Sequence, residues 1–464
     1  MNGFFTTVLS FWQIISLLIA QVVDVVWGLP LVILLVGGGS ILFVYAGFLP
    51  FRGFIHAFKL MLGLYHHPGE SKADGQLSHF QALTNAIAAT IGLGNIAGVA
   101  VAISQGGAGA VFWMWVSAFI GMNTKCFECT LSLMYRGRDY KGEVHGGPMY
   151  VIQQAMPKQL KFLAYVFAIC GLIGCMALFQ TNQLAHYAQE QIGCPPLLIG
   201  LLGAGFVLIV MKGGIERLGH VTGAMVPVMT VIYVVSCLII LVLNFDKVPE
   251  TIMLIFKEAF SGRAAGGGVA GYAVAEVMKV GVKRAAFSNE AGVGTAPMAH
   301  SNVRTNEPAS EGLVAMLEPF LDTIVVCTMT ALVILIGLPS GQGSAEEGIL
   351  LTRLAFDNSL GVAGPWLLGA AIFLFSTTTM LGMANYNLKC WNFLFRGRWG
   401  LGENVFYVYF CGTLILASVA EITDVVNILD IGYGLMAYPN MLAVLMLAPK
   451  VKKTIKEYIE KYQI

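Results

Sequence analysis

Charged side chains are scarce in this chain, and their scarcity excludes most soluble folds. Only 11% of the 464 residues are Asp, Glu, Lys or Arg, whereas 57% are hydrophobic. A soluble domain carries about 25% charged residues. The formal net charge of +1 also argues against a nucleic-acid partner. The composition therefore predicts an all-α polytopic membrane protein.

Motifs for catalysis and for structural metals are missing as well. The chain has no HExxH, no P-loop and no Ser/His/Asp order that supports a triad. Its nine cysteines fall mostly inside apolar segments, and the lone CxxC of Cys126 and Cys129 has no second pair. No basic residue precedes the first apolar run, as a signal peptide would require. We predict no enzyme activity, no cofactor and a packing role for the CxxC.

Apolar windows of about 20 residues can cross the hydrocarbon core of a bilayer. Eleven such windows lie at 28–48, 79–104, 107–135, 161–191, 196–211, 217–243, 249–286, 312–337, 361–386, 403–421 and 425–448. Residues 4–27 are apolar but include Gln13, Gln21 and Asp24, so they form either a surface helix or a twelfth span.

The basic residues predict the orientation of these spans. With the C-terminus inside, 22 of the 27 Lys and Arg residues fall in inner loops and in the tail 449–464. The outer loops hold Lys247, Lys257, Arg263 and Arg353. Positive residues favour the cytoplasmic side. We therefore predict a multi-pass protein of the plasma or bacterial inner membrane with a cytoplasmic C-terminus.

The segment Thr90-Ile91-Gly92-Leu93-Gly94-Asn95-Ile96 interrupts a membrane window. Glycine weakens a helix by about 1 kcal/mol relative to alanine. Backbone freed from helical pairing at this depth survives only where it is buried in protein or lines a cavity. The break is either a packing kink or a binding site, where amides hold an anion and carbonyls hold a cation.

A second interruption, rich in glycine, lies at 260–271 in the window 249–286. It is either a flexible loop or a hinge. Five spans begin with the first broken window and five with the second, and paired interrupted helices are typical of inverted-repeat transporters. We favour the hinge, with repeats at 79–243 and 244–448, an N-terminal helix and linker at 1–78 and a basic tail at 449–464.

Polar groups inside the windows are candidate ligands. Ser376-Thr377-Thr378-Thr379 offers four consecutive hydroxyls, which either bond back to their own helix or form part of a cation site. Gln180-Thr181-Asn182 either joins helices or lines a cavity. Ionisable groups at such depth are functional hypotheses, and they are Lys125, Glu128, Glu318, Asp322 and Asp430. Lys125 and Glu128 are predicted to pair locally, three residues apart.

Six motifs together resemble the alanine/glycine:cation symporter family. They are Gly92 to Ala100, Gly106 to Trp115, Gly121 to Lys125, Gly146 to Tyr150, Phe287 to Gly294 and Asp322 to Leu332. The resemblance covers about residues 20 to 448. It implies a leucine-transporter-like fold, with ten core helices as a five-plus-five inverted repeat and one extra N-terminal helix. It also implies import of alanine or glycine driven by sodium or protons.

The resemblance also implies site residues. The substrate carboxylate would meet the amides of Gly92, Leu93 and Gly94, with Asn95 beside them. Sodium would meet the carbonyls of Ala88, Ile91 and Phe375 and the hydroxyls of Thr378 and Thr379. Further substrate contacts are implied for Gln180 and Asn182 and for the hinge glycines Gly267, Gly268 and Gly271.

One position departs from the family pattern. Where the family usually has tryptophan after the glycine that follows the hydroxyls, this chain has Met383. If Met383 lines the pocket, a flexible thioether replaces a rigid ring. We expect a sodium-coupled importer of a small neutral amino acid. Proton coupling, a larger substrate such as serine or glutamine, a channel and a non-transporting amino-acid sensor are the alternatives.

Overall fold

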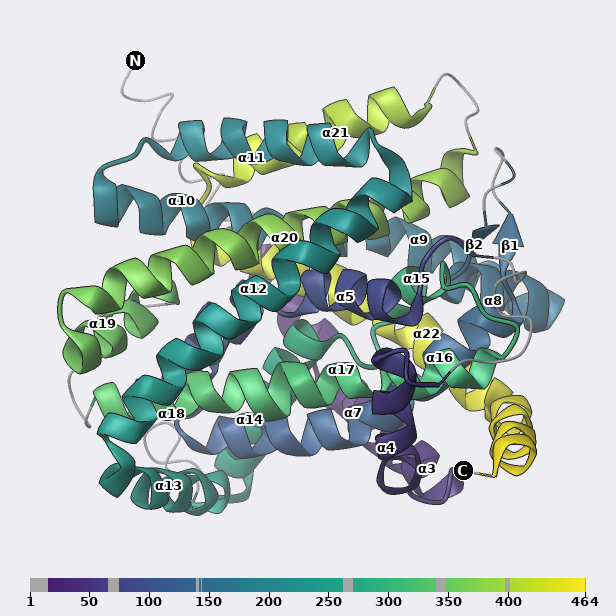
Figure 1. Ribbon diagram of the computed structural model, residues 1–464, viewed down its shortest axis with the longest axis horizontal. Coiled ribbons are helices and arrows are strands. Elements are labelled where there is room, and N and C mark those ends of the chain that lie inside the picture. Colours follow the sequence, from purple (N-terminus) through teal and green to yellow (C-terminus); the bar gives the residue numbers. More distant parts are fainter. Residues whose placement is uncertain are drawn as a thin grey trace.

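The structure is a computed structural model that describes residues 16–65, 75–138, 142, 144–261, 270–338, 348–396 and 401–463. Nearly every regular element is a helix (Figure 1). Among the described residues one pair of short strands, β1 (Gly137–Arg138) and β2 (Val144–His145), forms an antiparallel sheet, with Gly137 opposite His145. The fold class predicted from composition is confirmed.

The helices of the first half follow a helix at Ser16–Val26. They are α2 (Leu29–Val32), π-helix η1 (Ile33–Gly37), α3 (Gly38–Tyr45), α4 (Leu49–Met61), α5 (His79–Thr90), 3₁₀ helix η3 (Leu93–Asn95), α6 (Ala97–Gly106), α7 (Gly109–Met134), α8 (Pro148–Ala155), η4 (Lys158–Leu160), α9 (Leu163–Gly174), α10 (Leu178–Ile192), α11 (Pro196–Met211) and α12 (Gly214–Leu243).

The helices of the second half begin with a short 3₁₀ turn. They are η5 (Phe245–Lys247), α13 (Val248–Phe260), α14 (Ala270–Asn289), α15 (Ala296–His300), α16 (Pro308–Ala315), α17 (Leu317–Pro319), π-helix η6 (Phe320–Cys327), α18 (Thr328–Gly337), α19 (Ile349–Leu360), α20 (Ala363–Phe395), α21 (Glu403–Ala417) and α22 (Ile422–Tyr462).

Several described helices are long and apolar enough to cross a membrane. They are Lys158–Ile192, Gly214–Leu243, Pro308–Gly337, Ala363–Phe395 and Ile422–Tyr462, and the bent pairs Ser16–Val26 with Leu29–Tyr45 and His79–Thr90 with Leu93–Gly106 pass together. The helices α11 and α21 are apolar but shorter. The segment 16–26 thus continues, with a 42° bend, into the first predicted span.

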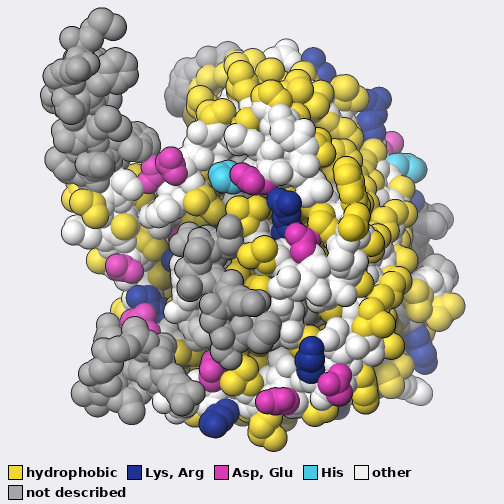
Figure 2. Space-filling model, turned by 90° about the vertical axis from the view of Figure 1, so that its left-hand side faces the viewer, with side chains coloured by type: hydrophobic (Ala, Val, Ile, Leu, Met, Phe, Trp, Pro, Cys, Tyr) yellow, Lys and Arg dark blue, Asp and Glu magenta, His cyan; other side chains and the backbone are white. Residues whose placement is uncertain are grey.

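The exterior carries the apolar belt that a bilayer requires. Exposed hydrophobic side chains follow α11 and α12, including Leu202, Ile209, Val231 and Val242 at 61–71% exposure. In Figure 2, seen from the end that carries α13 and α19, hydrophobic side chains cover the top and the right flank, and charged side chains lie in the centre and toward the lower edge. A lipid environment makes such exposure favourable, whereas water would penalise it.

The structure divides the chain differently from the prediction in the window 249–286 and at the tail 449–464. The window 249–286 holds two helices, α13 and α14, and residues 262–269 between them, including Gly267 and Gly268, lie outside the described residues. Gly271 lies in α14. The predicted tail 449–464 continues α22 as far as Tyr462 without a break.

The core positions α5 at the centre of the molecule. A capping box starts this helix: the Gln81 amide donates to the Ser78 hydroxyl at 3.2 Å, and the Ser78 amide donates to the Gln81 side chain at 3.0 Å. Helices α12, α20 and α15 pack against α5, and α12 and α20 cross it in Figure 1. Because every side is covered by protein, the end of α5 is shielded from lipid.

Candidate functional site

The chain leaves helical geometry directly after α5. Ile91 has φ −74° and ψ 89°, Gly92 is extended, and α5 and the following helix differ in direction by 57°. In a continued helix the Gly92 amide would bond the Ala88 carbonyl. Here it donates to the Asn95 side-chain oxygen at 2.9 Å, while the Asn95 amide donates to the Gly92 carbonyl at 3.1 Å. The Ala88 and Ile91 carbonyls are thereby released from the helical pattern.

A buried hydroxyl on α20 faces this break. Thr379 is 0% exposed, and its hydroxyl has no hydrogen-bond partner among the described residues. A Cβ built on Gly92 would lie 2.2 Å from that oxygen, so the Thr379 hydroxyl touches the interrupted backbone. The Ser376 hydroxyl, one turn earlier, is likewise buried without a partner in the described structure. A buried polar atom left without a partner is costly, so these oxygens are available to a ligand.

The other predicted cation ligands on α20 are engaged with their own helix. The Thr378 hydroxyl donates to the carbonyls of Leu374 at 2.9 Å and Phe375 at 3.1 Å. A hydroxyl that donates its proton to a carbonyl still has lone pairs to offer a cation. Gly382 allows α20 to lie on the α5 backbone, because a Cβ there would come within 2.7 Å of the Ala89 Cα.

A second interrupted helix lies beside the first. Helix α14 ends at Asn289 and α15 begins at Ala296. Between them Glu290, Gly292 and Gly294 have positive φ of 58°, 86° and 93°. Positive φ is strained for residues other than glycine. The structure therefore breaks the chain at 290–295, well after the predicted hinge at 260–271.

The two breaks touch each other. A Cβ built on Gly94 would lie 3.5 Å from the Phe287 ring and 3.6 Å from the Ser288 Cα, at the end of α14. From the sequence we predict no break within the motif Phe287 to Gly294. The signal was available, because Gly292-Val293-Gly294 repeats the glycine spacing of Gly92-Leu93-Gly94.

A buried carboxylate ties the two breaks to a third element. Asp322 is 0% exposed in η6 and accepts hydrogen bonds from Asn95 at 2.6 Å, Ser288 at 2.7 Å and Thr323 at 2.7 Å. No basic side chain pairs with it among the described residues. Asn95 therefore spans from the Gly92 amide to this carboxylate. A buried charge without a counter-charge is expensive, so the position favours a cation.

The remaining predicted substrate contacts fall in different surroundings. Asn182 donates to the carbonyls of Ala417 at 3.0 Å and Ala420 at 2.7 Å, so its amide joins α10 to the end of α21. Gln180 is 5% exposed on the same helix. Met383 is 4% exposed, and the Tyr433 hydroxyl lies 3.6 Å from its sulfur. Met383 thus faces the protein interior and not lipid.

The intramembrane charges pair over long sequence distances. The prediction that Lys125 pairs with Glu128 is wrong: Lys125 Nζ lies 3.0 Å from Glu318, and Glu128 accepts from Asn440. Both Lys125 and Glu318 are fully buried, and a buried charge takes the partner with the best geometry. Neighbours in one helix are free to point elsewhere.

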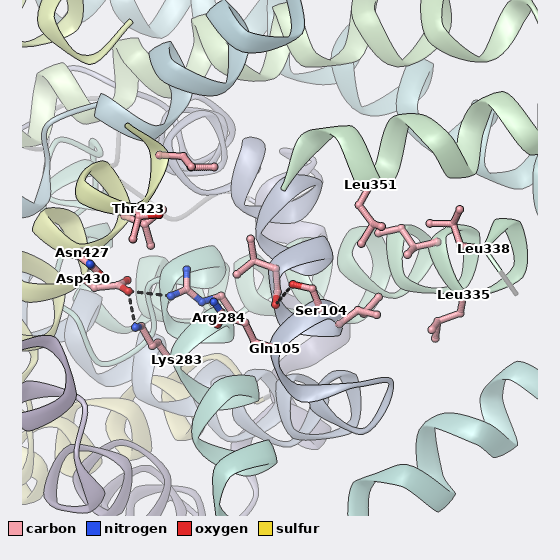
Figure 3. Close-up of a pocket in the computed structure, with 15 residues that line it drawn as sticks. Ser104, Gln105, Lys283, Arg284, Leu335, Leu338, Leu351, Thr423, Asn427 and Asp430 are labelled. Carbon is pink, nitrogen blue, oxygen red and sulfur yellow. Dashed lines mark hydrogen bonds and ion pairs between the residues drawn. The ribbon is translucent and has the colours of Figure 1, made fainter. Parts of the chain in front are cut away.

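Asp430 forms an ion-paired cluster at the wall of a cavity. It lies 2.5 Å from Lys283 and 2.8 Å from Arg284, as the dashed lines in Figure 3 show. The cavity of about 500 Å³ is also lined by Gln105, at the end of α6, and by Leu351. Asp430 is therefore neutralised within the protein.

Two interrupted helices that meet inside a bundle of membrane-length helices define a secondary transporter. The crystal structure of MhsT in complex with L-phenylalanine shares this fold, with a TM-score of 0.56 at 14% identity, over 82% of this chain and 98% of that one. The predicted leucine-transporter-like fold is confirmed.

The sodium:alanine symporter family model matches residues 12–463, and the chain belongs to that family. Sodium/alanine symporter AgcS of Methanococcus maripaludis is 38% identical over 96% of this chain and 97% of its own. Probable sodium/glutamine symporter GlnT of Bacillus subtilis is 30% identical over 96% of this chain and 91% of its own. The chain is thus a multi-pass sodium-coupled amino-acid symporter and not an enzyme.

Proposed function

We propose that this protein imports a small neutral amino acid of the alanine and glycine class together with sodium. The observation that carries the proposal is the Thr379 hydroxyl, which is buried without a partner against the break at Gly92. Hydroxyl and carbonyl oxygens are the hard ligands that sodium prefers. Ala88 and Ile91 supply released carbonyls in the same break. On α20, Thr378 directly precedes Thr379, and Phe375 lies about one turn before it.

The substrate carboxylate belongs at the start of the 3₁₀ turn. The amides of Leu93 and Gly94 bond no acceptor among the described residues, whereas the Gly92 amide is held by Asn95. Free amides at a helical start attract an anion. Gly94 has no side chain to cover them, and the Phe287 ring lies 3.5 Å from the position that a Gly94 Cβ would take. Of the three amides predicted to hold the carboxylate, those of Leu93 and Gly94 therefore remain available to it.

Asp322 supplies a second cation position in this proposal. Its two oxygens are held by donors from η3, α14 and η6, the three elements that meet at the breaks. A cation beside Asp322 would neutralise the buried carboxylate and fasten both breaks at once. Sodium binding and substrate binding would then stabilise the same closed arrangement.

A larger substrate is the second candidate, because of Met383. Its flexible side chain lines the interior beside Tyr433, where the family pattern has a ring. The relative GlnT, named as a glutamine symporter, is similar over nearly all of both chains. We place the C-terminus in the cytoplasm and the inverted repeats at 79–243 and 244–448, on the charge pattern and the paired breaks.

Counterflow in proteoliposomes tests the proposal. Vesicles loaded with unlabelled alanine, glycine, serine or glutamine are diluted into labelled amino acid with sodium, or with choline and an inward proton gradient. We expect accumulation of labelled alanine or glycine only with sodium. Accumulation driven equally well by protons in choline would contradict sodium coupling. Preference for glutamine would select the larger-substrate alternative.

A further inference from the structure

A chain of buried ionisable groups runs through the half of the molecule that carries α15, separate from the positions assigned to sodium and substrate. Glu311 in α16 accepts from His79 at the start of α5 and from His300 at the end of α15, the latter at 2.5 Å. His300 also faces Glu318, with Nε2 3.7 Å from the carboxylate. Lys125 of α7 completes the chain at Glu318.

The geometry around His300 favours a ring with protons on both nitrogens. A carboxylate only accepts hydrogen bonds, so Nδ1 must donate to Glu311. Nε2 points at a second carboxylate and has no hydrogen-bond partner within the described residues, and neither does the Glu318 Oε1 atom. His300 is 0% exposed. A neutral ring would leave a bare nitrogen lone pair against a carboxylate, whereas an imidazolium satisfies both sides.

The charge balance of the surroundings points the same way. Lys125, a permanent cation of the cluster, pairs with Glu318 and also interacts electrostatically with Glu290, Glu128 and Cys129. From α20, Lys389 donates to the Met298 carbonyl and to Ser301, at the end of α15. Buried carboxylates in excess over cations are costly unless protons compensate them. A proton on His300 removes part of that excess.

The position of the cluster links this proton to movement. His79 precedes the first break along α5, and His300 follows the second break along α15. Glu311 holds both short helices against α16, and the backbone amides of Gln76, Leu77 and Arg304 tie the outer ends of α5 and α15 together. In Figure 1, α15 and α16 lie to the right of α5. Separating the short helices from α16 would pull His300 from both carboxylates.

We propose that His300 binds a proton that holds the half-helices α5 and α15 against α16 in a closed arrangement, which we call the latch. Separation of these helices from α16 releases the proton to water. The proposal rests on the proposed function, because it regulates the same two breaks. The closed end binds the proton more tightly than the open end. Raising the pH therefore favours opening, and one linked proton allows at most about a tenfold change per pH unit.

The test is the pH profile of sodium-driven alanine uptake in proteoliposomes, with the same pH on both sides from 5.5 to 8.5 and saturating sodium. We expect wild-type uptake to rise several-fold with pH and uptake by the His300→Gln variant to change less than twofold. His220→Gln is the matched control, because His220 is exposed on α12 and bonds only the Glu216 carbonyl one turn away. The control should keep the wild-type profile.

Alanine binding by purified protein in sodium shows whether each variant is folded. If His300→Gln fails to bind, Glu318→Gln replaces it, since that change removes the acceptor facing Nε2. A wild-type profile in either binding-competent variant overturns the latch. Loss of sodium dependence in the wild type would instead overturn the proposed function.

Wild-type protein provides a measurement that needs no variant. Alanine is added to sodium-loaded protein in weak buffer with a pH indicator, and closure should take up a measurable fraction of a proton per molecule near neutral pH. Alanine binding with no proton uptake anywhere from pH 6 to 8.5 also overturns the latch.

Discussion

Replacement of Thr379 by valine separates a sodium ligand from a structural hydroxyl. Valine keeps the branched shape and removes the one oxygen that faces Gly92. That oxygen has no partner in the described structure, so its loss breaks no recorded hydrogen bond. Removing an unsatisfied buried polar atom is neutral or stabilising, by up to about 1–3 kcal/mol. We therefore expect Thr379→Val to keep or raise the melting temperature.

The affinity for sodium, in contrast to the melting temperature, should fall strongly. A contact between a charged group and a polar atom contributes about 1.5–3 kcal/mol, which corresponds to roughly 10- to 150-fold in affinity. The sodium concentration for half-maximal uptake should rise by that factor, while the maximal rate at saturating sodium falls less. Thr413→Val, on α21, is the matched control, because its hydroxyl bonds the Phe410 carbonyl at 2.7 Å in its own helix.

The assay is labelled-alanine uptake into proteoliposomes over a sodium titration at constant ionic strength, alongside a thermal melt of the purified protein. Thr378→Val is measured in parallel, and its hydroxyl already donates to the carbonyls of Leu374 and Phe375. Unchanged sodium dependence in both variants would refute the cation site on α20. A strong loss of stability in Thr379→Val would refute the interpretation of its hydroxyl as unpaired.

Three further changes test other parts of the site. Gly94→Val should abolish alanine binding, because its side chain covers the free amides where the ligand must approach; an alanine ester that competed as well as alanine would place the anion site elsewhere. Met383→Trp should suppress larger substrates by tens-fold while sparing glycine, since a pocket discriminates a methylene by about 1–3 kcal/mol; an equal loss for every amino acid would make the residue structural. Lys125→Met should destabilise the protein by about 3–5 kcal/mol, because it breaks a fully buried ion pair and leaves Glu318 with only the longer contact to His300. The exposed control Lys456→Met should shift the thermal melt little, and a melt as stable for Lys125→Met would contradict the buried pair.

The sequence alone determined the class of the protein and its first break. Long apolar windows and few charges leave the bilayer as the only favourable solvent. Gly92 and Gly94 both weaken a helix at that depth, so they mark a break. Both features are local, so they can be identified from composition and spacing. The repeated spacing at Gly292 and Gly294 is equally local. The longer glycine run at 260–271 is the more conspicuous signal, and the hinge is predicted there instead.

Which polar groups meet depends on how the helices pack. Asp322 accepts from Asn95 across 227 residues of chain and from Ser288 across 34. Glu318, rather than the neighbouring Glu128, pairs with Lys125. Hydroxyls in one run also differ: Thr378 bonds its own helix while Thr379 faces the break. Such choices depend on helix rotation and on the burial energy of each partner, which long-range packing sets and local sequence does not.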